Sequence, residues 1–166
     1  NFQKYISEKI KIFNNQSEND FSIIGVDDKV TSYLVKKLKK KLNSKIITIS
    51  GKNNSADIYV KNRKLIINLN LGKKKVFKKI NIEQFKNFLG EHNYQNIAAV
   101  YAIILSLGFL DWKKIENSIK SFKILPHRLQ KIRKVCDITF INDSKATNID
   151  AADQALKNFN NIYWIL

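Results

Sequence analysis

The segment FINDSKATN, from Phe140 to Asn148, decides the fold class of this 166-residue chain. A strand-like apolar run, Ile138 to Ile141, leads into it, and a helical pattern follows it from about Ile149 to Phe159. The polar residues between the two are Asp143, Ser144, Lys145, Thr147 and Asn148. Such residues cluster where the carboxyl edge of a sheet binds a ligand. The segment therefore predicts an α/β fold with a candidate site at the end of a strand.

Spacing alone leaves two interpretations of this segment open. Thr147 or Asn148 could cap the following helix, whose N-terminal amides favour an anion. In the other interpretation the segment is only a capped turn, and Lys145 is a solvated lysine.

Strand-like and helical patterns also alternate through the first part of the chain. Apolar residues at steps of three and four predict an opening helix with one buried face, from Phe2 to Phe13. Phe21 to Val26 predicts a short buried strand, and a lysine-rich helix follows it. Further strands joined by tight turns are expected at Ile46 to Ile49, Ala56 to Val60 and Leu65 to Leu69.

Two more helices are expected before the only proline. Asn93 to Leu107 is rich in Ala, Ile and Leu and is closed by Gly108, which predicts a buried helix that ends at a glycine. Asp111 opens another helix, which ends near Phe122.

Pro126 predicts a domain boundary, because a proline disfavours helical geometry at the residue before it. We place residues 1–124 in one domain and residues 125–166 in another. The strand-like runs of the second part are Leu129 to Val135, Ile138 to Ile141 and Ile162 to Leu166. A helix separates the last two runs, and this order of strand, helix and strand predicts the beginning of a parallel sheet.

The composition is that of a globular protein with enough apolar residues for a core, at 44% hydrophobic and 11% aromatic. No apolar run reaches the ~18 residues that a membrane helix needs, and the start does not resemble a signal peptide. Cys136 is the one cysteine, which excludes an internal disulfide. We expect a cytoplasmic protein without a membrane partner. The chain starts at Asn1 without a methionine and stops inside an apolar run at Leu166, so we expect a fragment.

The charge of +16 indicates affinity for phosphates without saying which molecule carries them. The lysines form short runs at Lys36 to Lys41 and Lys73 to Lys79, and a single aromatic residue, Phe77, is not the repeated interleaving that stacks on bases. A general bias toward lysine explains them better than a nucleic-acid footprint, and we expect no nucleic-acid partner. A non-catalytic basic module that binds nucleotides or nucleic acid remains the alternative.

Four further residues are candidates for a nucleotide site. The guanidinium of Arg128, beside His127, could bind phosphate or stack on a purine, although a surface ion pair is the simpler interpretation. Asn93 and Asn96 fall on one side of a first helical turn, where their amides could recognise an adenine edge, or Asn93 could simply start the helix.

Other polar residues give weaker signals. Lys9 lies four residues after Tyr5, and by itself it is a solvated lysine. Asp27 and Asp28 could bind a metal, but two acidic residues after a strand more often cap the next helix. Cys136 has no base near it in the sequence and is treated as structural.

Four segments together resemble the Mur ligases, from about Tyr5 to Leu166. They are YISEKIKIF (Tyr5 to Phe13), GEHNYQNIAAVYA (Gly90 to Ala102), LPHRLQ (Leu125 to Gln130) and INDSKATNIDAADQAL (Ile141 to Leu156). The last two are similar to the branch of the family that adds D-glutamate to UDP-N-acetylmuramoyl-L-alanine. The resemblance implies the later part of a central ATP-binding domain in residues 1–124, and the first units of a Rossmann-like C-terminal domain in residues 125–166.

The resemblance also implies roles for single residues. Asn93 and Asn96 would contact adenine. The residues that would surround the nucleotide are His127, Arg128, Asp143 and Lys145. Thr147 would face the γ-phosphate and D-glutamate. Lys9 aligns with a lysine that is carbamylated in the family and helps to hold Mg²⁺, a role that only the resemblance suggests.

The implied reaction belongs to peptidoglycan biosynthesis. ATP phosphorylates the carboxylate of UDP-N-acetylmuramoyl-L-alanine, and the amine of D-glutamate attacks the acyl phosphate. Magnesium and Lys145 would offset the charge of the phosphates. The full-length enzyme is expected to be a monomer.

The sequence also departs from the family pattern. It contains no GxxxxGK[ST] phosphate loop, the motif that cradles the β- and γ-phosphates. Gln130 stands where a glutamate is common, and Glu8 where an alanine is common. We therefore expect this chain alone to have no ligase activity. A separate nucleotide-binding domain that has lost catalysis is a third possibility.

Overall fold

The computed structural model describes residues 1–166 except 53, 73, 86–92, 124, 158 and 166, and it does not describe the side chains of 150 and 154. The chain divides into two compact units. One consists of Asn1–Glu83 and Asn93–Leu110, and the other of Gln84–His92 and Asp111–Leu166.

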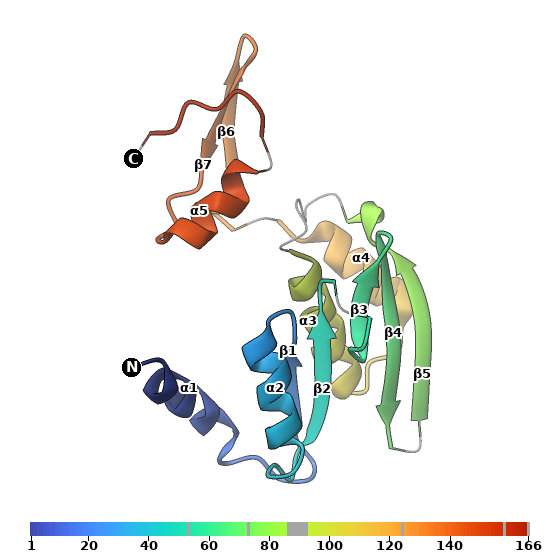
Figure 1. The fold of residues 1–166 in the computed structure, drawn as a ribbon. Coiled ribbons are helices and arrows are strands. Elements are labelled where there is room, and N and C mark those ends of the chain that lie inside the picture. Colours follow the sequence, from blue (N-terminus) through green and yellow to red (C-terminus); the bar gives the residue numbers. More distant parts are fainter. Residues whose placement is uncertain (53, 73, 86–92, 124, 158, 166) are drawn as a thin grey trace. The chain divides into compact units, whose positions relative to one another are not determined.

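The first unit is a mixed sheet with helices on both faces (Figure 1). Its strands follow the order β1-β2-β3-β4-β5, in which β1, β2 and β3 are parallel and the last two pairings are antiparallel. The elements are α1 (Phe2–Ile10), the 3-10 turn η1 (Lys11–Phe13), β1 (Phe21–Gly25), α2 (Lys29–Leu38), β2 (Lys45–Ser50), β3 (Ile58–Lys61), β4 (Lys64–Leu71), β5 (Lys74–Asn81) and α3 (Asn93–Ser106). A second 3-10 turn, η2 (Ile82–Gln84), follows β5.

The helix α2 supplies the crossover that the parallel pair β1 and β2 requires. Its residues Val35 and Leu38 are buried with Ile24, Val26 and Ala56 in one apolar cluster. Burial of each large apolar side chain contributes roughly 1.5–3 kcal/mol, which holds α2 against its face of the sheet. The prediction of a buried strand followed by a lysine-rich helix is confirmed.

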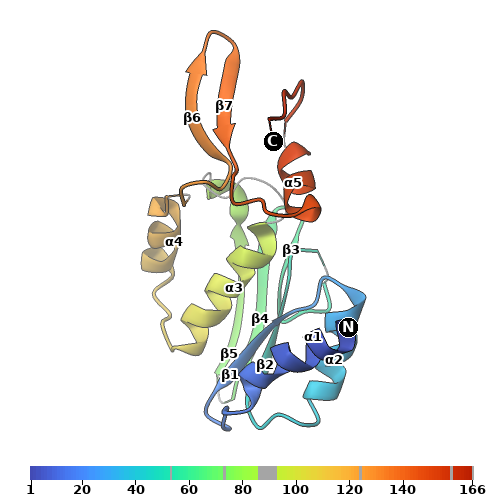
Figure 2. The ribbon, with the colours of Figure 1, turned by 90° about the vertical axis from the view of Figure 1, so that its left-hand side faces the viewer.

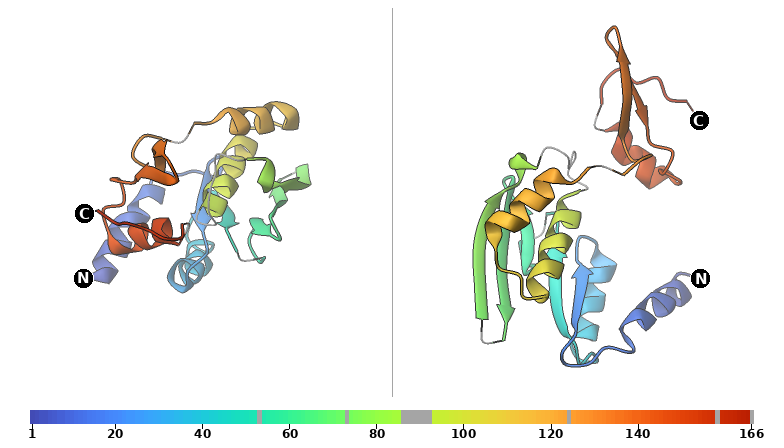
Figure 3. Two further views of the ribbon diagram at one scale, coloured as in Figure 1. Left: turned by 90° about the horizontal axis from the view of Figure 1, so that it is seen from above. Right: turned by 180° about the vertical axis from the view of Figure 1, so that it is seen from behind.

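The helix α3 covers the opposite face of the sheet from α2 (Figures 2 and 3). It contacts β1, β2 and β3, and its buried residues recur at the spacing of a helical face. They are Ile97, Ala98, Tyr101, Ala102 and Leu105. Gly108 has φ of 85°, a conformation that glycine adopts without a Cβ clash, so the predicted buried helix and its glycine end are confirmed.

The strand β5 was not predicted, because the run Lys73 to Lys79 was interpreted only as a cluster of charge. Residues Lys74 to Asn81 pair antiparallel with β4 across a turn at Gly72, whose φ is 74°. Lysine is a poor strand former, but pairing with a buried neighbour overrides that preference. The other predicted strands of this unit correspond to β2, β3 and β4. Lys73 lies outside the described residues.

The opening helix forms where it was predicted, but its expected buried face is largely wrong. No residue of α1 is buried, and Phe2 and Tyr5 are 62% and 59% exposed. Only Ile10, together with Phe13 of η1, packs against the apolar cluster beneath α2. Periodicity identifies a possible apolar face, but it cannot show whether the fold provides a surface to cover it.

Among its described residues, the second unit contains two α-helices and a hairpin. They are α4 (Trp112–Ser121), β6 (Gln130–Val135), β7 (Ile138–Asn142) and α5 (Ile149–Leu156). The carboxylate of Asp111 accepts a hydrogen bond from the amide of Lys114, so the predicted start of this helix is confirmed.

The expected parallel pairing of the runs before and after α5 does not form among the described residues. β6 and β7 pair antiparallel, because only Cys136 and Asp137 join them and a parallel pair needs a far longer connection. Residues 162–165 form no strand, and α5 ends at Leu156 rather than at Phe159.

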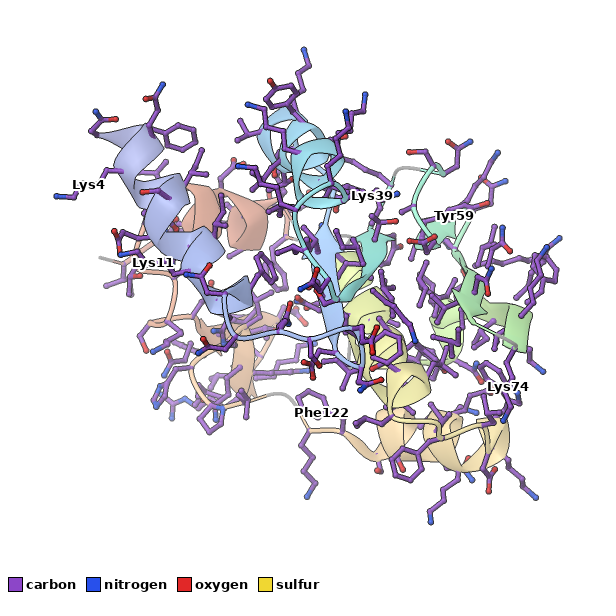
Figure 4. All side chains as sticks on the ribbon, turned by 90° about the horizontal axis from the view of Figure 1, so that it is seen from below. Lys4, Lys11, Lys39, Tyr59, Lys74 and Phe122 are labelled. Atoms are coloured by element: carbon purple, nitrogen blue, oxygen red, sulfur yellow. The ribbon has the colours of Figure 1, made fainter. Side chains whose placement is uncertain are left out.

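The positive charge is spread over several elements of the first unit. Figure 4 shows Lys4 and Lys11 at α1 and η1, Lys39 at the end of α2 and Lys74 at the start of β5. No helix in the described part of the chain has the length and apolar character to cross a membrane.

Candidate functional site

Asp27 organises the carboxyl ends of the first two strands. It follows β1 closely, and its carboxylate accepts a hydrogen bond from the hydroxyl of Ser50. The amide of Gly51 lies 3.0 and 3.1 Å from its two oxygens, and the side-chain amide of Gln95 donates to Oδ2 over 2.8 Å. Asp27 therefore joins β1, β2 and α3.

Of the two adjacent acidic residues, only Asp28 caps the next helix. Its carboxylate accepts from the amide of Thr31 at 2.8 Å and from the Thr31 hydroxyl at 2.7 Å. These two hydrogen bonds hold the pKa of Asp28 below its usual value, and the bond from the Thr31 hydroxyl has the larger effect. The expectation of capping is confirmed for Asp28 and wrong for Asp27.

Because Gly25 has no side chain, the side chain of Gln95 can occupy the space beside it. A Cβ at Gly25 would lie 2.7 Å from Nε2 of Gln95 and 2.9 Å from its Cδ. Gly51 is also close to α3, since a Cβ there would be 3.3 Å from the amide nitrogen of Gln95. The end of α3 thus approaches the sheet closely at two glycines.

Asn93 and Asn96 lie on the first turn of α3, as the sequence predicted. Asn96 is exposed, and its side-chain amide donates to Oδ1 of Asn93 over 3.2 Å. Asn93 is half-buried, so of the two side chains only that of Asn96 is exposed at the N-terminal end of the helix. His92 and Glu91 lie outside the described residues.

A hollow of about 290 Å³ opens beside Asp27, at the carboxyl end of β1 and the start of α2. Its lining is mixed in charge and consists of Val26, Asp27, Asp28, Lys29, Ser32, Tyr33 and Lys36. In α/β sheets, ligands bind at this edge of the parallel strands. A second hollow, of about 500 Å³, runs along polar residues of α4 and contains none of the predicted site residues.

In the second unit, the segments LPHRLQ and INDSKATN are joined by hydrogen bonds. The amide of Lys145 donates to the carbonyl of His127 at 3.1 Å. The amide of Leu129 donates to Oδ1 of Asp143 at 2.9 Å, and the side chain of Asn142 lies 3.0 Å from Nδ1 of His127. Three of the predicted nucleotide residues, His127, Asp143 and Lys145, therefore gather at one end of the hairpin.

The backbone of LPHRLQ is held in an uncommon conformation. His127 and Leu129 have φ of 66° and 47°, in the left-handed region that non-glycine residues rarely adopt. Arg128 lies between them and is exposed. The carboxamide oxygen of Gln130 accepts from the amide of His127 at 2.9 Å, a role that a glutamate carboxylate would also fill. Such strain persists where surrounding contacts enforce it, as they do here.

Asn148, rather than Thr147, caps α5. Its side chain accepts from the amide of Ala151 at 2.9 Å. Thr147 and Lys145 are both exposed, so their polar groups are accessible to a ligand. The sequence left open whether Thr147 or Asn148 caps the helix. The structure shows that Asn148 is the cap, and the exposed side chain of Thr147 does not fill this role.

Lys9 is exposed on α1, with its ammonium 5.4 Å from the centre of the Tyr5 ring. Among the described residues there is no group of three or more His, Cys, Asp or Glu side chains that could hold a metal ion. A carbamylated Lys9 would supply one carboxylate, whereas Mg²⁺ in nucleotide sites is held by one or two carboxylates together with substrate phosphates and water. These residues alone do not form a magnesium site.

The family follows from sequence similarity. Residues 1–104 match the model of the Mur ligase middle domain. The chain belongs to the Mur ligase family. The fold agrees, because a crystal structure of MurF from Acinetobacter baumannii superimposes with a TM-score of 0.63 at 22% identity, over 92% of this chain and 32% of that chain.

Curated relatives of this Mur ligase chain share one name, UDP-N-acetylmuramoylalanine–D-glutamate ligase. That of Rickettsia bellii is 39% identical over 99% of this chain and 36% of the relative. That of Caulobacter vibrioides strain NA1000 is 33% identical over 97% of this chain and 34% of the relative. A shorter match to that of Rickettsia conorii is 51% identical over 48% of this chain. The chain thus spans about a third of the length of the first relatives that it matches.

Sequence reasoning missed Gly25 and Gln95 and gave Asp27 a different role. A glycine at the end of a strand is a weak signal of close approach, and nothing in the sequence pairs it with a residue 70 positions away. The two asparagines near Gln95 were recognised by their spacing, whereas Gln95 acts through a contact that only the fold creates.

Proposed function

We propose that this chain is part of an ATP-dependent ligase that adds D-glutamate to UDP-N-acetylmuramoyl-L-alanine in peptidoglycan biosynthesis. Residues 1–124 form the later part of the ATP-binding domain, and residues 125–166 begin the domain that binds the amino acid. The name shared by the relatives supports this reaction. The full-length protein acts as a cytoplasmic monomer with neither a nucleic-acid nor a membrane partner.

The observation that carries the proposal is the junction of LPHRLQ with INDSKATN. Its hydrogen bonds fix the backbones of His127 and Lys145 against each other, and the carboxylate of Asp143 holds the amide of Leu129. A lysine, a histidine and an aspartate are thereby placed together before the first turn of α5. The amides of a helix N-terminus favour the same anionic ligands as Lys145.

Each unit by itself supplies some of the proposed contacts with the nucleotide. Asn93 and Asn96 contact the adenine edge, since each carboxamide offers both a donor and an acceptor. His127, Arg128 and Asp143 contact the nucleotide from the second unit. Arg128 suits this role because a guanidinium can bind oxygen atoms bidentately or stack on a purine.

The chemistry of the second unit is charge neutralisation. Transfer of the γ-phosphoryl group to the substrate carboxylate gives an acyl phosphate and ADP, and Lys145 offsets the charge on the moving group. Attack by the amine of D-glutamate then forms the amide and releases phosphate, with Thr147 facing both groups. No step is assigned to Mg²⁺, which would offset phosphate charge; a carbamylated Lys9 would supply one of its oxygen ligands.

A segment exchange tests the proposal. The chain replaces the matching segment of the Rickettsia bellii ligase, and formation of the D-glutamate amide is measured together with phosphate release. We expect ligation in this hybrid and its loss in Lys145→Met, because the methionine keeps the length of the side chain without its charge. Lys131→Met, an exposed lysine of β6, is the matched control and should remain active.

Two outcomes would contradict the proposal. One is a folded hybrid that binds ATP but forms no amide, which would remove the ligase assignment. The other is a hybrid in which Lys145→Met and Lys131→Met behave alike, which would remove Lys145 from the phosphate site.

A further inference from the structure

A polar contact attaches the first turn of α3 to the sheet edge at Asp27. The side-chain nitrogen of Gln95 donates to Oδ2 of Asp27, and both oxygens of that carboxylate also face the amide of Gly51. Ser50 donates to Oδ1 from β2. Ser50 of β2 and the following Gly51 hold the carboxylate independently of the helix, so it is a fixed acceptor for Gln95.

The glycine at the end of β1 makes this attachment possible. The Gln95 carboxamide lies within 2.7 to 2.9 Å of the place where a Cβ of Gly25 would stand. Any larger residue would push the carboxamide away from Asp27. The absence of a side chain at Gly25 thus leaves room for the Gln95 carboxamide beside Asp27.

Gln95 stands between the two asparagines of the predicted adenine site. Asn96 is the next residue and Asn93 lies two positions before Gln95, and the two asparagines are joined by their own hydrogen bond. Successive residues of a helix point about 100° apart, so a side chain held on the sheet side sets the direction of its neighbours. A rotation of this turn would move both asparagines together.

We propose that Asp27 and Gln95 are positioning residues for adenine recognition. They hold the first turn of α3 in the rotation that presents Asn93 and Asn96 to the base, and they do not touch the nucleotide themselves. This inference rests on the proposed function, since it assumes that the two asparagines contact adenine. Its consequence is selectivity between adenine and guanine, which a general loss of stability would not alter.

A reciprocal exchange of charge tests the contact. Gln95→Glu places a second carboxylate 2.8 Å from Asp27, where no donor remains between the two. Asp27→Asn in the same chain restores a donor, because the new amide nitrogen can donate to the carboxylate introduced at position 95 while the amide oxygen accepts from Ser50 and Gly51. The double variant has the same net charge as the original chain. Asp27→Asn alone has a smaller effect than Gln95→Glu, since the Gln95 carboxamide can turn to present its oxygen.

The measurement is a titration of the ¹⁵N-labelled chain with ATP and separately with GTP, followed by the side-chain amide signals of Asn93 and Asn96. The free energy of unfolding is measured on the same samples with urea. We expect Gln95→Glu to lower the ATP affinity by roughly tenfold, as for an unpaired polar group, and to bring the ratio of ATP to GTP affinity close to one. The double variant should recover that ratio. Ser106→Ala, at the far end of α3, is the control and should keep it.

The outcomes separate this inference from the proposed function. An original chain that binds ATP and GTP equally contradicts the adenine site itself. An original chain that prefers ATP, with a Gln95→Glu variant that retains this preference, overturns the positioning role. Loss of preference without recovery in the double variant also overturns it, because the contact would then not be the cause.

Discussion

The carboxylate of Asp143 accepts a hydrogen bond from the backbone amide of Leu129 at 2.9 Å, across the base of the hairpin formed by β6 and β7. Leu129 has φ of 47°, so this contact helps to hold an uncommon backbone conformation. Asp143 thus has a structural task besides its proposed place at the nucleotide.

Replacement of Asp143 separates these two tasks. Asp143→Ala leaves the amide of Leu129 without this acceptor, and we expect the hairpin base to lose about 1–2 kcal/mol of local stability. Hydrogen exchange at the amides of Leu129 and Lys145 measures the loss. Asp143→Asn keeps an acceptor oxygen and should retain most of the protection while it weakens contacts that need the charge. Equal exchange in all three proteins would show that the hydrogen bond does not hold the loop.

The cap of α2 should contribute to stability in a pH-dependent way. Asp28→Ala removes the acceptor for the amide of Thr31, and we expect the chain to lose about 1 kcal/mol of unfolding free energy. Asp28→Asn should cost less, since asparagine also caps helices well. Urea unfolding at neutral pH compares the three.

The sign of the pH dependence follows from the lowered pKa of Asp28. A carboxyl whose pKa is lower in the folded protein stabilises it above its unfolded pKa of ~3.9. The contribution is lost as the pH falls from that value through the folded pKa. The difference between the original chain and Asp28→Asn should therefore shrink below about pH 4, and a difference that grows there would contradict the assignment.

A side chain at Gly25 should displace the carboxamide of Gln95 from Asp27. Gly25→Ala puts a Cβ 2.7 Å from the Gln95 carboxamide, which must then leave Asp27. We expect a loss of about 1 kcal/mol, the usual contribution of the displaced hydrogen bond, because the end of the Gln95 side chain is free to rotate away. Gly25→Ala combined with Gln95→Ser should lose less than the sum of the two single variants, because the shorter side chain removes the clash. Additive losses would mean that the two residues do not interfere.

The sequence was sufficient for those parts of the fold whose information is local. The alternating strands, the buried helix α3 and the capping by Asp28 depend on periodicity and on neighbours within a few residues. β5 escaped prediction because its lysines are acceptable only beside β4. The strand expected after α5 does not form at residues 162–165, because an apolar run does not show whether a neighbouring strand is there to pair with it.

The residues of the candidate site also fall into those that a local pattern reveals and those that it does not. Asn93, Asn96, His127 and Lys145 were named from short segments, and the structure then showed which of them are neighbours within each unit. The link between Asp27 and Gln95 spans 68 positions, so no local pattern could reveal it. What the sequence lacked was the position of the carboxyl ends of the strands relative to the first turn of α3.

The lysines of β5 should protect an open sheet edge. Lys75 and Lys79 are exposed on the last strand of the sheet, where a charged side chain discourages pairing with another chain. The double variant Lys75→Thr and Lys79→Thr should aggregate at lower concentration, because threonine favours strands. The control, Lys39→Thr and Lys52→Thr, has the same net charge but changes a helix end and a loop. Light scattering against concentration compares them, and equal scattering would assign the effect to net charge alone.

The chain by itself should bind nucleotide weakly and release no phosphate. Its 166 residues contain no GxxxxGK[ST] motif, whose backbone amides cradle the β- and γ-phosphates, and the described residues hold no cluster for a metal ion. Lys145 and Arg128 can attract phosphates, but positioning rather than attraction accounts for most of the catalysis of phosphoryl transfer. We therefore expect ATP binding with no phosphate above background when ATP, Mg²⁺, UDP-N-acetylmuramoyl-L-alanine and D-glutamate are supplied together. Phosphate release that depends on D-glutamate, and that Lys145→Met abolishes, would show that the residues of this chain suffice for catalysis.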